Sequence, residues 1–281
     1  MKPLLTTPDT GIMIAVDGND GCGKSTQITL LMDWLREEYP GRKVAYVKCP
    51  AMHGGPGILR RLSLGEPVVG VTTTHDLMPG MPVFNPDMAG EETMPDGLTQ
   101  RWILFAEWLW TYQHEVLPLL RDDTIVVLDR SHFLSNYVYG IGQGIPEHLV
   151  ERVVAEQFAH TRHPDLVVVL DMPVDVAKAR IAGRPDTTEK GANHFDLASE
   201  ETFLLRQRCF RELSDRWEWV AVVDATGTPD EVSARVCATV AAKLYERAQS
   251  TAHEALQACA ITEAVRLVAG GFVGAINSPE T

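Results

Sequence analysis

The sequence predicts a doubly wound α/β fold, in which a five-stranded parallel sheet carries helices on both faces. The first observation is a set of continuous apolar runs rich in β-branched residues, which indicates strands that are covered on both sides. These runs occupy residues 11–16, 43–47, 124–128, 165–170 and 219–223. The second observation is that helical patterns separate the runs. Strand and helix therefore alternate along the chain, which predicts right-handed crossovers and a parallel sheet.

The helical patterns also delimit one domain. They cover about residues 24–38, 99–120, 147–160, 174–182, 197–216 and 229–247. Residues 65–98 do not fit the repeat, because they are rich in Pro, Gly, Met and Thr and show no sustained period; an insert of that length inside a compact domain is usually functional. We therefore expect one domain over residues 1–245 and a C-terminal helical extension over residues 246–281.

Composition and charge exclude several classes of protein. The chain has 281 residues and a net charge of −13, which argues against binding of nucleic acid or of an anionic membrane over a broad surface. Five scattered cysteines without a CxxC pair indicate reduced thiols, so we expect a cytoplasmic protein. No uninterrupted apolar stretch approaches the ~20 residues of a membrane helix, and no membrane association is expected.

A phosphate-binding loop follows the first predicted strand. The stretch GNDGCGKS has the spacing Gly-x-x-x-x-Gly-Lys-Ser and leads directly into a helix. Its glycines allow backbone N–H groups to turn toward phosphate oxygens, Lys24 would reach the outer phosphates of ATP, and Ser25 would ligate Mg²⁺. The residues expected to bind the nucleotide are Gly18, Gly21, Gly23, Lys24, Ser25 and Thr26.

Two further motifs indicate a second phosphate site. The third strand ends in Asp129 and Arg130; the carboxylate could join the Mg²⁺ shell, and the guanidinium could bind a second phosphate group. We interpret residues 183–195 as a lid loop. Arg180 lies just before this loop and Arg184 lies at its start, and both arginines would neutralise charge on the transferred phosphoryl group. Together these motifs predict a small-molecule phosphotransferase. A GTPase fits less well, because the chain has no NKxD motif of the kind that recognises guanine.

At these residues the chain resembles the thymidylate kinase family of P-loop nucleoside monophosphate kinases. The resemblance follows the family order over about residues 11–245. Its motifs are GNDGCGKSTQ, Phe105-Ala106, Asp129-Arg130, Ser135-x-x-x-Tyr139, VVVLDMPVDVAKARI at 167–181, a pattern from His194 to Phe210, and VVVDATGTPDEV at 221–232.

The resemblance implies a role for each matching position. Asp20 would contact the sugar hydroxyl and the acceptor phosphate, and Arg130 would bind that phosphate. Phe105 would stack on the pyrimidine, Tyr139 would lie against the sugar, and Ser135 belongs to the same substrate-binding set. Because Gly21 stands where some members carry a loop arginine, the catalytic cations would come from Arg180 and Arg184. The family also implies ATP, Mg²⁺, a nucleotide acceptor and a homodimer.

The chain departs from the family at positions that bear on specificity. Leu109 stands where a helix arginine facing the base is expected, and the segment after the second strand lacks its usual arginine. The expected reaction is ATP-dependent phosphorylation of a deoxypyrimidine monophosphate, with dTMP as the first choice. Alternatives are a kinase for a modified pyrimidine, free or in DNA, and a deoxynucleoside kinase, although residues 49–58 offer no carboxylate base. A non-catalytic ATP-binding sensor is the alternative outside enzymes.

Overall fold

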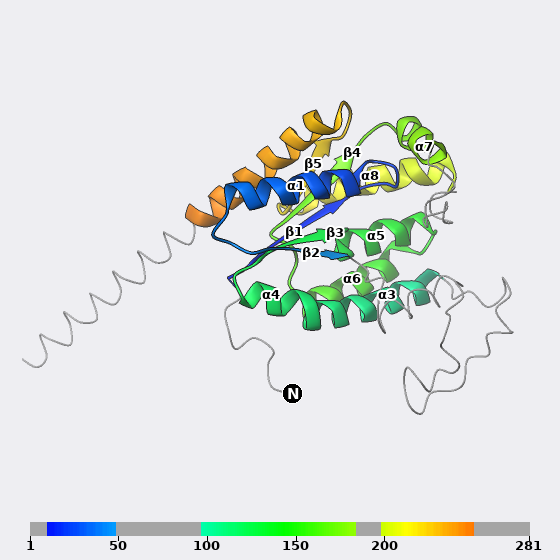
Figure 1. Ribbon diagram of the computed structural model, residues 1–281. Coiled ribbons are helices and arrows are strands. Elements are labelled where there is room, and N and C mark those ends of the chain that lie inside the picture. Colours follow the sequence, from blue (N-terminus) through cyan, green and yellow to red (C-terminus); the bar gives the residue numbers. More distant parts are fainter. Residues whose placement is uncertain (1–9, 49–96, 184–197, 250–281) are drawn as a thin grey trace, which may run out of the picture. The chain divides into compact units, whose positions relative to one another are not determined.

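The computed structural model describes residues 10–48, 97–183 and 198–249 (Figure 1). Within these ranges five strands form one sheet in the order β2-β3-β1-β4-β5, and every neighbouring pair is parallel. The strands are β1 (Ile12–Asp17), β2 (Val44–Lys48), β3 (Ile125–Asp129), β4 (Leu166–Asp171) and β5 (Val220–Asp224). The predicted five-stranded parallel sheet is thereby confirmed, and each strand lies within one residue of its predicted start and end.

Helices separate the strands along the chain, as the sequence predicts, but the helix over residues 132–142 was not among the predicted helical segments. They are α1 (Lys24–Glu38), α3 (Gly97–Thr111), η4 (Tyr112–Val116), α4 (Leu117–Arg121), α5 (His132–Gly142), α6 (Glu147–His160), α7 (Val174–Ala182) and α8 (Glu200–Arg216), followed by a helix over residues 229–249. The chain divides into two compact units, residues 1–237 and 238–281. Most of the predicted insert and lid, and the tail beyond residue 249, lie outside the described residues.

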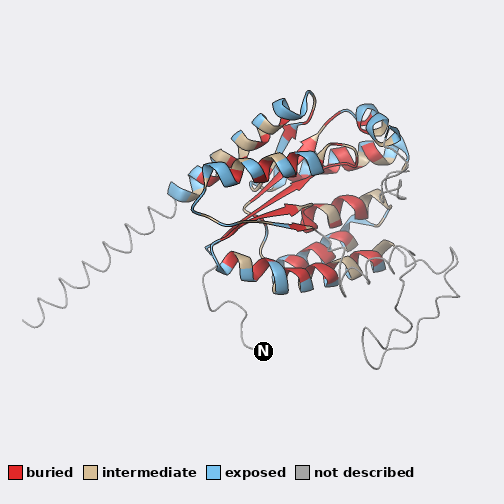
Figure 2. Ribbon diagram, viewed as in Figure 1, coloured by how far each residue is buried: buried red, intermediate tan, exposed pale blue. Residues whose placement is uncertain are grey.

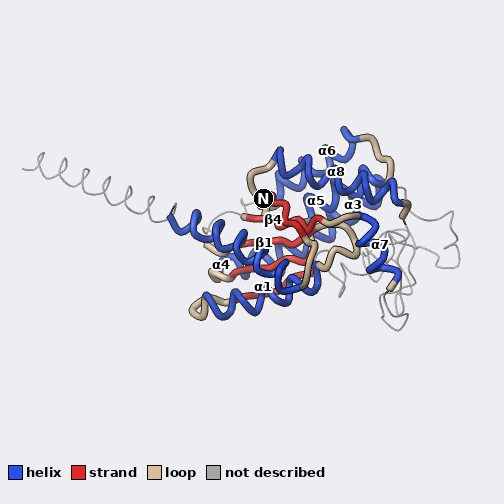
Figure 3. The backbone as a smooth tube through the Cα atoms, turned by 90° about the horizontal axis from the view of Figure 1, so that it is seen from above, coloured by secondary structure: helices blue, strands red, loops and turns tan. Residues whose placement is uncertain are grey.

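Helices cover both faces of the sheet. Met13 and Ala15 of β1 face a large apolar cluster to which α3, α5, α6 and α8 contribute. Ile14 and Val16 alternate with them, are equally buried, and point to the opposite face, where α1 packs on β1, β2 and β3. Figure 3 places α1 on one side of the sheet and α6 and α8 on the other, and Figure 2 shows that the strands between them are buried. This two-sided cover explains why the strands read as continuous apolar runs.

One helical pattern of the sequence contains a local irregularity. The predicted helix over 99–120 is α3, η4 and α4 in succession, with a π-helical turn over Tyr112–Val116. Pro118 lies in the first turn of α4 and lacks the N–H that a regular α-helix would use at that position. The wider turn accommodates the proline without ending the helix. Within the described ranges no helix is long and apolar enough to cross a membrane.

A histidine lies in the core where α3, α5 and α6 meet. His132 is 5% exposed, and its ring stacks on Trp108 with centroids 5.3 Å apart. Its Nε2 lies 2.8 Å from Nε2 of Gln157, so the amide donates to an unprotonated ring nitrogen. Burial, together with the charge of Arg101, lowers the pKa of His132 well below its ordinary value. The folded protein therefore holds this imidazole neutral.

This burial predicts acid sensitivity. In the unfolded chain His132 binds a proton below about pH 6.5, whereas in the folded chain it does not, so stability is lost as the pH falls. His132 should lower the free energy of unfolding by up to about 1.4 kcal/mol per pH unit between about pH 6.5 and pH 5. Urea unfolding across this range should give a flatter pH slope for His132→Phe than for the wild type. His148→Phe, at an exposed position of α6, should keep the wild-type slope, and equal slopes for all three proteins would contradict the prediction.

Candidate active site

The phosphate-binding loop has a backbone that only glycines allow. Gly18, Gly21 and Gly23 all have positive φ, at 133°, 83° and 94°. A side chain at Gly18 would meet the carbonyl oxygen of Leu170 at 2.5 Å, and one at Gly21 would meet that of Ala177 at 2.4 Å. The loop therefore packs closely against β4 and α7, and its glycines are needed for backbone approach as well as for conformation.

An arginine of α7 reaches this loop. Nη1 of Arg180 lies 3.7 Å from the position that a Cβ at Gly23 would take. Its guanidinium therefore lies close to the last glycine before Lys24. Arg184, the second predicted lid arginine, lies outside the described residues.

Lys24 lies inside the loop. Its Nζ donates to the carbonyl oxygens of Gly18 and Asn19 at 3.0 and 2.8 Å and lies 4.0 Å from Oδ1 of Asp20. Because a lysine ammonium has three donors, it can donate to both carbonyl oxygens and to Sγ of Cys22, 3.7 Å away, while its charge acts on Asp20. The predicted positive charge is thus at the centre of the loop, buried to the same degree as Asp20.

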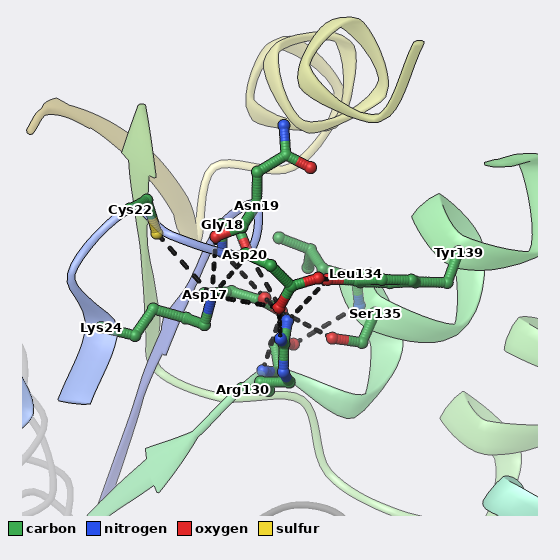
Figure 4. A network of polar contacts seen from close by, with 11 residues as sticks. Asp17, Gly18, Asn19, Asp20, Cys22, Lys24, Arg130, Leu134, Ser135 and Tyr139 are labelled. Atoms are coloured by element: carbon green, nitrogen blue, oxygen red, sulfur yellow. Dashed lines mark hydrogen bonds and ion pairs between the residues drawn. The ribbon is translucent and has the colours of Figure 1, made fainter. Parts of the chain in front are cut away.

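Arg130 connects the loop to α5 (Figure 4). Its Nη2 is ion-paired with Asp20, and its Nη1 donates to the hydroxyl of Tyr139 at 2.9 Å and lies 3.4 Å from the carbonyl oxygen of Gly18. The Tyr139 hydroxyl in turn donates to Oδ2 of Asp20 at 3.0 Å. Arg130 holds this position with a left-handed backbone, φ 80°, which is costly for a residue with a side chain and typical of functional sites.

Charge and burial fix the protonation of this cluster. Burial alone would raise the pKa of Asp20, but the charges of Arg130 and Lys24 hold that pKa well below its ordinary range. Burial raises the pKa of Tyr139 far above its usual value, so its hydroxyl stays protonated and can donate to Asp20. Asp20 is therefore an ionised hydrogen-bond acceptor at neutral pH and not a proton donor.

Asp17 is a site residue that the sequence analysis missed. Its side chain at the end of β1 is fully buried; Oδ1 accepts from the backbone N–H of Gly18 at 2.8 Å, and Oδ2 accepts from that of Ser131 at 3.0 Å. Oδ2 also accepts from the Ser135 hydroxyl at 3.0 Å, while Oδ1 lies 3.6 Å from Nη1 of Arg130. The sequence did contain a signal for Asp17, since it is the one carboxylate in an otherwise apolar strand and directly precedes the phosphate-binding loop.

Of two further predicted substrate-binding residues, one joins the loop cluster and one lies apart from it. Ser135 joins the cluster, where its hydroxyl donates to Asp17. Phe105 is 8% exposed and belongs to the apolar core, where its ring stacks with that of His132 at 6.4 Å between centroids. Leu109, one helical turn later, packs against the same core.

The predicted magnesium ligands, Ser25 and Asp129, offer a hydroxyl and a carboxylate oxygen near the carboxyl ends of the strands. Ser25 and Thr26 are exposed in the first turn of α1. Asp129 ends β3 beside β1, in register with Val16, and its Oδ2 accepts from the Tyr46 hydroxyl at 3.2 Å. Among the described residues no three His, Cys, Asp or Glu side chains form a metal cluster. A hydroxyl and one carboxylate fit Mg²⁺, which takes one or two protein ligands and completes its shell with phosphates and water.

Comparison with known proteins identifies the family. The family described as thymidylate kinase matches residues 91–236 of this chain, just over half of its length. The chain belongs to the thymidylate kinase family. It is 31% identical over 234 residues to the thymidylate kinase of Gluconobacter oxydans, an alignment that covers 82% of this chain and 94% of that protein.

Other members of the family are similar over the same extent. The thymidylate kinase of Cereibacter sphaeroides is 28% identical over 234 residues, which cover 82% of this chain and 94% of that protein. A protein of Thermococcus onnurineus named "Probable thymidylate kinase" is 28% identical over 242 residues, 84% of this chain and the whole of that protein. As a member of the thymidylate kinase family, the chain is an ATP-dependent nucleoside monophosphate kinase.

The contacts of Asp17 predict the effect of removing one of its oxygens. In Asp17→Asn the amide N–H₂ must face either Gly18 N–H or the donors of Ser131 and Ser135, so at least one buried donor loses its acceptor. We expect the free energy of unfolding to fall by about 1–3 kcal/mol and the catalytic efficiency to fall at least about tenfold. Urea unfolding and an ADP-release assay measure the two effects.

The matched control is Asp33→Asn. Asp33 lies on the exposed face of α1, where its side chain is 61% exposed and pairs with Arg36. This change should alter the free energy of unfolding by less than about 0.5 kcal/mol. Wild-type stability and turnover in Asp17→Asn would show that Asp17 does not organise the site.

Proposed function

We propose that the protein transfers the γ-phosphoryl group of ATP to a deoxypyrimidine nucleoside monophosphate, with dTMP as the principal acceptor. The observation that carries the proposal is the link between Lys24 and Arg130 through Asp20. One carboxylate lies 4.0 Å from the loop ammonium and is ion-paired with the strand-end guanidinium. A cation suited to the donor phosphates and a cation suited to the acceptor phosphate therefore lie on either side of a single side chain.

The chemistry of this arrangement is positioning and charge stabilisation. A monophosphate acceptor is already anionic, so the reaction needs no base to remove a proton from a neutral hydroxyl. Lys24 and the loop N–H groups would hold the donor, Arg130 would hold the acceptor, and Arg180 would reach the transferred group from α7. Ser25 and the Asp129 carboxylate would hold Mg²⁺, which would supply positive charge against the ATP phosphates.

Asp20 and Tyr139 would position the sugar of the acceptor. Asp20 is ionised, so it can accept a hydrogen bond from a sugar hydroxyl. Tyr139 is 5% exposed and is held by Asp20 and Arg130, so its ring offers a rigid surface beside the acceptor phosphate. Such a surface would disfavour a 2′-hydroxyl, which supports a deoxynucleotide.

We further propose a cytoplasmic homodimer. Exposed aromatic side chains on two neighbouring helices support self-association, since Trp102 and Trp110 on α3 are 41% and 42% exposed and Phe158 on α6 is 38% exposed. Such residues are enriched in protein interfaces. Light scattering at micromolar concentration should give twice the mass of the chain, and a monomer mass would contradict the proposal.

An ADP-release assay over several acceptors tests the reaction. The panel is dTMP, dUMP, 5-hydroxymethyl-dUMP, dCMP and dGMP, with thymidine as the nucleoside control. We expect the highest catalytic efficiency with dTMP and none above background with thymidine. Preference for 5-hydroxymethyl-dUMP would support the modified-pyrimidine alternative, turnover of thymidine a deoxynucleoside kinase, and the absence of all turnover a nucleotide sensor.

Arg130→Ala in the same assay tests the role of the second cation. We expect kcat/KM for the acceptor to fall about 100-fold while the Kd of ATP changes little, because charge-assisted hydrogen bonds to the acceptor phosphate are lost. Arg130→Lys keeps the positive charge beside Asp17 and Asp20, so kcat/KM should fall less than in Arg130→Ala. It should still fall, since lysine lacks the planar pair of donors. An equal loss of ATP affinity in both variants would contradict the assignment.

A further inference from the structure

A second buried arginine lies near the site, on α3. Arg101 is 2% exposed, and within the described part of the chain its Nε and Nη2 have no hydrogen-bond partner. Its backbone carbonyl oxygen accepts from Nδ2 of Asn136, so the helix position itself is held. Buried arginines are rare unless they are paired, because an uncompensated buried charge destabilises the fold strongly. The side chain therefore calls for a functional reason.

The two atoms without partners form one edge of the guanidinium. Nε–H and Nη2–H point in the same direction, and this parallel pair is the edge that arginine uses to bind two adjacent acceptors or to converge on one oxygen. Both atoms are buried, so the edge faces into the protein. A pair of aligned, buried donors matches a ligand that supplies oxygen or nitrogen acceptors.

The electrostatic surroundings of Arg101 also favour such a ligand. Burial lowers the pKa of Arg101 to about 10, and the positive charge of Arg206 contributes in the same direction. Arg206 is 2% exposed, and its guanidinium lies 4.5 Å from the centre of the Tyr139 ring. In the described residues no carboxylate forms an ion pair with Arg101. Electron-rich acceptor atoms beside it would relieve this concentration of positive charge.

The position of Arg101 indicates which part of a nucleotide it would meet. It lies one helical turn before Phe105 on the same face of α3, and its Cδ lies 3.6 Å from the position that a Cβ at Gly140 would take. Gly140 follows Tyr139, whose hydroxyl is held at Arg130. From Arg130 the path therefore runs past Tyr139 to Arg101, in the order in which a nucleotide presents phosphate, sugar and base.

We propose that Arg101 contacts the base of the acceptor nucleotide, donating Nε–H and Nη2–H to a pyrimidine carbonyl oxygen or, in cytosine, to the adjacent O2 and N3. The inference rests on the proposed function, which supplies the acceptor. Leu109, which stands where a base-facing arginine is expected, packs against the apolar core. Arg101 would supply the charged donor that Leu109 cannot. Arg101 is then a specificity residue of the acceptor pocket.

Arg101→Met tests the proposal, since methionine fills a similar space without charge. We expect kcat/KM for dTMP to fall about 10- to 100-fold, the range for losing hydrogen bonds to a charged group, with the KM of ATP unchanged. The Ki of 2-deoxyribose 5-phosphate against dTMP should stay at the wild-type value, because this compound has phosphate and sugar but no base. Unfolding in urea without nucleotide should show the variant at least as stable as the wild type.

Each other result overturns the proposal in a distinct way. Unchanged kcat/KM for dTMP would show that Arg101 does not contact the acceptor. A parallel rise in the Ki of 2-deoxyribose 5-phosphate would show that it contacts the phosphate or the sugar instead of the base. Lower stability without nucleotide would indicate a structural role. A wild-type protein that turns over no monophosphate would refute the proposed function and this inference together. Arg152→Met, at an exposed position of α6, is the matched control and should leave every measurement unchanged.

Discussion

The buried carboxylate of Asp17 is the interaction on which the arrangement of the site depends. It accepts from the loop at Gly18, from the turn after β3 at Ser131 and from α5 at Ser135, three segments that meet only in the folded chain. A carboxylate has two oxygens with about four acceptor positions, so it can serve all three and still face Arg130. A neutral side chain of the same size would leave one buried donor without an acceptor, which a low-dielectric interior penalises.

Charged groups face one another within the cluster. The ionised Asp20 lies between two cations, Lys24 and Arg130, and Arg130 also faces Asp17, whose pKa is raised by burial. Incoming phosphates would compete with Asp20 and the loop carbonyl oxygens for the same N–H groups. Such an exchange of one set of acceptors for another would keep the cations hydrogen-bonded, which would lower the reorganisation that binding requires.

Local patterns in the sequence predicted the sheet, the loop and the strand-end arginine, because each depends on residues close together in the chain. The apolar run before Gly18 and the one before Asp129 needed no knowledge of the fold. Asp17 was missed because two of its partners, Ser131 and Ser135, lie more than 110 residues away, and a strand-end aspartate has no pattern that reveals them. The π-helical turn was missed because the helical pattern over 99–120 continues through it without a break, although Pro118 was visible. Phe105 matched a family position, but its burial against His132 depends on how α3 and α5 pack.

Different parts of the fold would build the two ends of the proposed acceptor site. The proposed phosphate end lies at the carboxyl edge of the sheet, where strand register places Asp129 beside β1 and leaves little freedom. The proposed base end lies between α3 and α5, whose separation depends on side-chain packing around Trp108 and His132. Tyr139 belongs to both, since its hydroxyl is bonded at the sheet edge and its ring lies beneath Arg206. A change in helix packing can therefore alter which base is accepted while the geometry of phosphoryl transfer stays the same.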